Sequence, residues 1–119
     1  MFTILAFPMF EWMQGDDDPS TLNWRNSRAM SYMKAGRPAK AVRLYKRTLA
    51  DCERMLGADN PNTLRSRNNL AMSYRAAGRT DEAIPLLERT LADCERVLGA
   101  RHPDTRAVRK SLAAFTAAR

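Results

Sequence analysis

The sequence predicts an all-α protein built from repeated, stacked helix pairs, and three observations carry this prediction. The heptapeptide TLADCER occurs at residues 48–54 and returns 42 residues later, at 90–96. Glycine and proline return at the same interval, as Gly15, Gly57 and Gly99 and as Pro19, Pro61 and Pro103. The chain is 45% hydrophobic with only five glycines, a composition typical of a helical domain. Dense internal identity at one long period indicates a solenoid, whose units bury their apolar faces by stacking.

The length, charge and cysteine content of the chain indicate how many domains it forms and which partners and compartment suit it. The chain has 119 residues, enough for one domain with one core. Its formal net charge is +7, which favours acidic protein partners or nucleic acid. It has two cysteines, Cys52 and Cys94, at equivalent places in the two copies of the heptapeptide, which favours a reduced, cytoplasmic setting over a disulfide framework.

The first element is an apolar N-terminal segment, residues 1–14. It has no basic start and no small-residue cleavage site, and Glu11 interrupts it, so we expect neither a signal peptide nor a membrane anchor. Residues 10–13 fall in register with residues 52–55, so the segment is interpreted as the degenerate end of a preceding repeat. It packs on the first unit in this interpretation, or leaves an exposed edge for self-association.

The repeat domain follows, over residues 15–119, with units 19–60 and 61–102 and a half unit 103–119. In each unit a first helix begins at the proline, which suits the first helical position. Asp18, Asn60 and His102 are the expected N-caps, and Gly36 and Gly78 the expected ends. The second helix is expected from about Ala39 or Asp81, with Thr80 as N-cap, and ends before Gly57 or Gly99.

The helical period assigns a core face to each helix of the middle unit. At 100° per residue, the first helix places Leu64, Arg67, Leu70, Ala71, Tyr74 and Ala77 on one side, and the second places Ile84, Leu87, Leu91, Cys94 and Leu98 on one stripe. TLADCER is therefore the core-facing turn of the second helix, and both cysteines are expected to be inert buried thiols.

An arginine recurs on the core-facing side of every first helix, at Arg25, Arg67 and Arg109. In one interpretation the three side chains form a cationic ladder for an anionic ligand. In the other they pair with glutamates fourteen residues earlier, at positions 11, 53 and 95, because an arginine near a core is costly unless it is paired. We expect the structural pairing.

Residues 68–105, NNLAMSYRAAGRTDEAIPLLERTLADCERVLGARHPDT, resemble a tetratricopeptide repeat, and more narrowly the 42-residue variety of kinesin light chains. The resemblance rests on Leu70, Ala71, Tyr74, Gly78, Ala83, Leu87 and the junction at residues 102–105. It implies a right-handed α-solenoid of antiparallel helix pairs, about two and a half units here, with the first helices lining a concave groove for peptides or proteins. Arg28 stands in the place of Leu70 and Arg106 in that of Leu64, so the outer units are expected to pack less well.

The side of the first helices opposite the core is the predicted binding face. Asparagine amides can donate to and accept from an extended peptide backbone, and methionine adapts to varied side chains. The predicted partner-binding residues are Asn23, Asn26, Met30, Met33, Arg65, Asn68, Asn69, Met72, Arg75 and Lys110. A solvated helix face without a ligand is the alternative.

The function predicted from these features is a scaffold or adaptor that binds a protein segment in the groove. The first helices are consistently positive, so the segment is expected to be acidic. The alternative is a nucleic-acid-binding helical protein that uses the same basic surface. No enzyme activity, cofactor or metal is predicted: the chain has no glycine-rich phosphate loop, and its single histidine, His102, is too few for a zinc site.

Overall fold

The structure, a computed structural model, describes residues 19–118 as five α-helices. They are α2 (Pro19–Lys34), α3 (Pro38–Leu56), α4 (Pro61–Ala76), α5 (Thr80–Val97) and α6 (Pro103–Ala117). This part of the chain contains no β-strand. The predicted all-α solenoid of helix pairs is confirmed, whereas the predicted N-terminal segment 1–14 lies outside the described residues.

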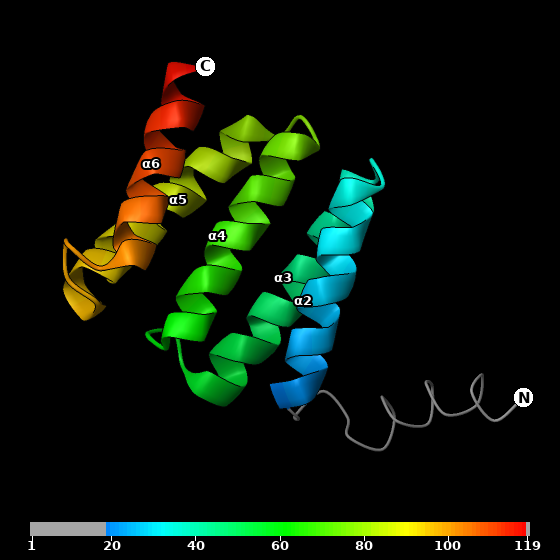
Figure 1. Ribbon diagram of the computed structural model, residues 1–119, viewed down its shortest axis with the longest axis horizontal. Helices are drawn as coiled ribbons and strands as arrows, with labels where there is room; N and C mark the ends of the chain where they lie inside the picture. The colour runs from blue at the N-terminus through cyan, green and yellow to red at the C-terminus, as the bar shows by residue number, and fades with distance from the viewer. Residues whose placement is uncertain (1–18, 119) are drawn as a thin grey trace, which may run out of the picture.

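The helices form two layers. In Figure 1 helices α2, α4 and α6 stand side by side at the front, and α3 and α5 lie behind them. Each helix packs mainly against the next one in the chain, and α4 also touches α6. The first helices of the three units therefore share one layer, called here the front layer, and the second helices form the back layer.

Of the three N-caps expected for the first helices, two are confirmed. The side chain of Asn60 accepts a hydrogen bond from the amide of Asn62 at 2.9 Å, and Nδ1 of His102 accepts one from the amide of Asp104 at 3.0 Å. Each cap satisfies a backbone N–H that the first turn of a helix leaves without a partner. Asp18 lies outside the described residues.

The predicted cap at Thr80 is wrong. Helix α5 begins at Thr80 itself, and the capping position is occupied by Arg79, whose side chain makes no capping hydrogen bond. The cause is the tight turn before it: Gly78 takes a φ of 76°, and the amide of Arg79 donates to the carbonyl of Tyr74 at 2.8 Å. This closure returns the chain to helical geometry one residue early.

The core follows the helical projection. Leu64, Leu70, Ile84 and Leu87 are buried, as the sequence predicts, and Val108 and Phe115 extend the same cluster into α6. Arg28 and Arg106, which replace core leucines of the middle unit, are both exposed. The guanidinium of Arg28 lies over the ring of Trp24, 5.3 Å from its centroid. The middle unit is therefore the best-packed part of the described structure.

The repeated heptapeptide joins the two helices at each unit boundary. Its threonines, Thr48 and Thr90, are buried and donate to carbonyls one turn earlier in the same helix. Its cysteines are buried, and the hydroxyl of Thr105 donates to the carbonyl of Cys94 at 3.3 Å. The same contact joins Thr63 to Cys52 at 3.4 Å. These contacts recur at the repeat period, which explains why the chain carries the heptapeptide twice.

The recurring arginines are structural, as predicted. The predicted glutamate pairing is confirmed for Arg109, whose Nη2 donates to Oε2 of Glu95 at 3.3 Å. Arg67 also has a second and nearer carboxylate, and position 11, the predicted partner of Arg25, lies outside the described residues.

Arg67 is 2% exposed, and its Nη1 donates to Oδ2 of Asp93 at 2.6 Å. The predicted partner, Glu53, lies farther from its guanidinium, at 3.7 Å. Arg25, also buried, pairs in the same way with Asp51. In both pairs the aspartate comes from the second helix of the same unit, which packs against the helix that carries the arginine.

Acid is expected to weaken this pairing. The hydrogen bond from Arg67 holds the pKa of Asp93 below its usual value, and Arg96 acts in the same direction. A carboxyl group with a lowered pKa in the folded state stabilises the fold above its unfolded pKa, about 4, and loses this contribution as the pH falls through the folded value. We expect the free energy of unfolding, measured by urea titration, to fall below about pH 4. The Asp93→Asn variant should have a lower free energy of unfolding than the unaltered protein at pH 7, and this free energy should fall less as the pH is lowered. The same pH dependence in both proteins would contradict the pairing.

Candidate functional site

The predicted binding residues come together in the front layer. Asn26, Met30 and Met33 lie on α2. Helix α4 carries the middle group, Arg65, Asn68, Asn69, Met72 and Arg75, and α6 carries Lys110. Asn23 lies on α2, but its side chain is outside the described part of the structure. Three adjacent helices thus contribute to one candidate face.

Two methionines are the exposed apolar elements of this face. Met30 is 49% exposed and Met72 is 41% exposed, and they occupy the same position in consecutive units. Met33 differs from them because it is only partly exposed and packs against the core. An unbranched thioether that stays in solvent can adapt to varied partner side chains.

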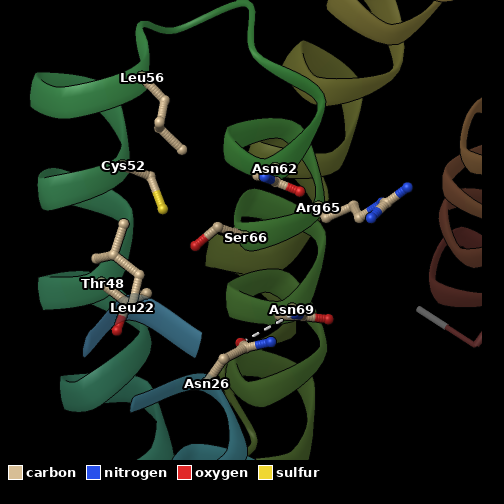
Figure 2. Close-up of a pocket in the computed structure, with 9 residues that line it drawn as sticks. All are labelled: Leu22, Asn26, Thr48, Cys52, Leu56, Asn62, Arg65, Ser66 and Asn69. Atoms are coloured by element: carbon tan, nitrogen blue, oxygen red, sulfur yellow. Dashed lines mark hydrogen bonds between the residues drawn. The ribbon is translucent and has the colours of Figure 1, made fainter. Parts of the chain in front are cut away.

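A polar pocket of about 220 Å³ opens between α2, α3 and α4. Figure 2 shows side chains from all three helices converging on it. Nδ2 of Asn69 donates to Oδ1 of Asn26 at 3.2 Å, which links α4 to α2 at one end of the pocket. The lining residues are Leu22, Asn26, Thr48, Cys52, Leu56, Asn62, Arg65, Ser66 and Asn69. This space is called the α2–α4 pocket below.

The corresponding cavity of the next unit is much smaller, about 40 Å³. Leu64, Asn68 and Cys94 line it at the positions that Leu22, Asn26 and Cys52 hold in the α2–α4 pocket. At the place of Ser66 it has Val108, a larger apolar side chain that is 3% exposed. The two units therefore have cavities at equivalent positions of the repeat, but the cavities differ in size and polarity.

The cationic residues of this face differ in the contacts that they already make within the protein. Nε of Arg65 donates to Oδ2 of Asp104 at 2.9 Å, so its charge is paired with α6. The guanidinium of Arg75 lies over the ring of Phe115, 4.5 Å from its centroid. Lys110 is exposed on α6. Lys110 is thus the cation of this group whose replacement disturbs the fold least.

The sequence predicted three of the nine residues that line the α2–α4 pocket, Asn26, Arg65 and Asn69. It places Thr48 and Cys52 in the core, and it assigns Ser66 and Asn62 to no site. Their helical positions are readable from the sequence, but their meeting depends on how α3 and α4 cross. The signal that was available is the exchange of Ser66 for Val108 at one repeat position, since a polar residue at a buried position marks an irregularity in packing.

The chemistry of the described residues is that of a binding surface. No group of three or more histidine, cysteine, aspartate or glutamate residues is placed to hold a metal within residues 19–118. Burial raises the pKa of the Cys52 and Cys94 thiols, which keeps them in the weakly nucleophilic thiol form. None of the described helices combines the length and the hydropathy that a membrane span needs.

Comparisons with known proteins agree with this architecture. The family model of the tetratricopeptide repeat matches residues 17–93 and 68–114. Two solved structures of a Podosopora anserina putative kinesin light chain, described as having nearly identical TPR-like repeats, are similar to the chain. One of them, a point variant, gives 32% identity and a TM-score of 0.76 over 85% of this chain; the other gives 31% and 0.79 over 86%. The chain spans 48% of each of them. No curated protein matches the chain.

Proposed function

Because the chain belongs to the tetratricopeptide repeat family, whose repeats generally mediate protein–protein interaction, we propose that it is an adaptor that binds an acidic protein segment across its front layer. One observation carries the proposal, namely the charge of the helices that form this layer. Helices α2 and α4 contain no carboxylate, and the one carboxylate of α6, Asp104, is paired with Arg65. Two of their cations, Arg25 and Arg67, are buried and paired with the back layer. The remaining cations of the two helices are Arg28, Lys34, Arg65 and Arg75, so the layer keeps an excess of positive charge.

The polar groups of the same layer suit an extended segment. Asn26, Asn68 and Lys110 occupy one position in three successive units, so their polar ends repeat across the layer. Oδ1 of Asn68 is buried and has no hydrogen-bond partner among the described residues. An extended backbone presents donors and acceptors at regular intervals, which asparagine amides can satisfy. Met30 and Met72 supply adaptable apolar contacts beside them.

The experiment that tests this proposal is a pull-down from cell lysate with the tagged chain, with and without nuclease, followed by mass spectrometry. We expect a discrete protein that remains after nuclease, and whose retention falls steeply between 50 and 500 mM NaCl (about a threefold change in screening length) because exposed charges are screened. Loss of all bound material after nuclease would contradict the proposal and support the alternative, nucleic-acid binding through the same basic surface.

We further propose that the chain self-associates through an end of the solenoid. The support is a difference between units. Tyr74 is 7% exposed in the core, whereas its counterpart Tyr32 is only half-buried, and the cations of Arg28 and Lys40 each lie 5.8 Å from the centre of its ring. Light scattering over a concentration series is the check, and a monomer at all concentrations would contradict this part of the proposal.

A further inference from the structure

The α2–α4 pocket contains a buried hydroxyl that the fold does not use. Oγ of Ser66 is shielded from solvent, and the residue is 5% exposed. It makes no hydrogen bond to nitrogen or oxygen among the described residues. Its polar neighbour is the Cys52 thiol, which is a weak acceptor. In Figure 2 the Ser66 side chain points from α4 into the space between α4 and α3. A buried hydroxyl without a strong partner is costly, so it is available to a ligand.

The other end of the pocket offers a donor and an acceptor side by side. Asn26 and Asn69 share one hydrogen bond. Each primary amide has one oxygen and one NH₂ group. Whichever way round the two amides are placed, a single bond between them leaves one oxygen and one NH₂ group without a partner in the pair. This conclusion does not depend on which side-chain atom is nitrogen and which is oxygen.

The charge of the pocket is close to balanced. Among the described residues that line it, the only cation is Arg65, which is paired with Asp104 at 2.9 Å. The remaining polar groups are three amides, two hydroxyls and a thiol, and Leu22 and Leu56 supply apolar wall. A carboxylate that entered would be desolvated without gaining an unpaired cation, which is unfavourable. A neutral group that both donates and accepts fits better.

We propose that the α2–α4 pocket receives the primary amide of an asparagine or glutamine side chain of the bound segment. This inference rests on the proposed function, because it names one residue of the segment held in the front layer. The amide oxygen accepts from the Ser66 hydroxyl, and the amide NH₂ group donates to the free oxygen of the Asn26–Asn69 pair. The corresponding cavity of the next unit, with Val108 and about 40 Å³, is too small for the same side chain. The pocket therefore fixes which residue of the segment lies against the first unit.

Selection of peptides tests this directly. The probe is a phage-displayed library of random dodecapeptides, selected on the whole chain and sequenced deeply, with Ser66→Val as the pocket variant. Valine is the residue that the next unit carries at this position, so the variant is compatible with the fold. Ser31→Val, the same change at an exposed site of α2 outside the pocket, is the matched control. Melting curves check folding, and Ser66→Ala replaces Ser66→Val if the latter unfolds.

The expected result is an acidic peptide set with asparagine or glutamine at one fixed position, favoured about tenfold over aspartate and glutamate there, since one or two buried hydrogen bonds are gained. The preference should disappear in Ser66→Val and persist in Ser31→Val. Acidic peptides without an amide preference, or a preference unchanged in Ser66→Val, would overturn the pocket assignment and leave the proposed function standing. No selected peptide at all would overturn both.

Discussion

Arg67→Ala is expected to lower the free energy of unfolding by about 3 kcal/mol at pH 7, because removing one partner of a buried ion pair usually costs 3–5 kcal/mol. The guanidinium is 2% exposed and joins three parts of the chain: Asp93 on α5 at 2.6 Å, the carbonyl of Ala58 at 3.3 Å and Glu53 on α3 at 3.7 Å. Asp93 and Glu53 are partly exposed, so water recovers part of the loss and places the expected value at the lower end.

The chain contains a matched control for this prediction, one repeat later. Arg109 makes the equivalent contacts, to Glu95 at 3.3 Å and to the carbonyl of Ala100 at 3.3 Å, but its side chain is 44% exposed. Exposed ion pairs contribute little, so Arg109→Ala should cost at most about 1 kcal/mol. Urea unfolding followed by circular dichroism measures both variants. If both variants lost the same free energy of unfolding, burial would not determine how much the arginine pairing stabilises the fold.

Phe115→Ala is expected to cost about 3 kcal/mol, in the range found when a buried aromatic side chain is truncated to alanine. Phe115 is 1% exposed and is the large apolar residue that holds α6 against the rest of the core. It also lies under the guanidinium of Arg75, so its loss removes a contact between α6 and α4. The position near the end of α6 keeps the expected cost at the low end of the range.

Phe115→Leu separates the two contributions. Leucine keeps most of the apolar volume but has no ring for Arg75, so the cost should be about 1 kcal/mol. Thermal unfolding of the two variants, with and without Arg75→Ala, measures the coupling between the residues. A cost for Phe115→Ala no larger than for Phe115→Leu would contradict the assignment of Phe115 to the core.

The repeat made most of the fold predictable from the sequence. Glycine and proline at one period located the helix ends, and the helical projection identified Leu64, Leu70 and Leu87 as core residues. The cap at Thr80 was misplaced, because Gly78 marks the turn in the sequence but not the residue at which the next helix begins. Errors of one residue at helix ends are usual for this reason.

The partner of Arg67 shows where the sequence stops being informative. Glu53 and Asp93 both recur at the repeat period, one before the arginine and one after it, so spacing cannot rank them. The ranking depends on how closely α4 approaches α5, which only the three-dimensional structure gives. The α2–α4 pocket was missed for the same reason, since Asn26 and Asn69 meet across two units and Ser66 faces α3.

The central claim is that the front layer binds the partner, and charge reversal at one residue of each layer tests it most directly. Lys110→Glu changes an exposed residue of the front layer, and Arg43→Glu makes the same change in charge at an exposed residue of α3 in the back layer. Binding of the recovered protein partner to each purified variant would be measured by titration calorimetry at low salt. We predict a loss of about tenfold or more for Lys110→Glu, as expected when a charge facing an acidic segment is reversed, and little change for Arg43→Glu. The opposite order would contradict the claim.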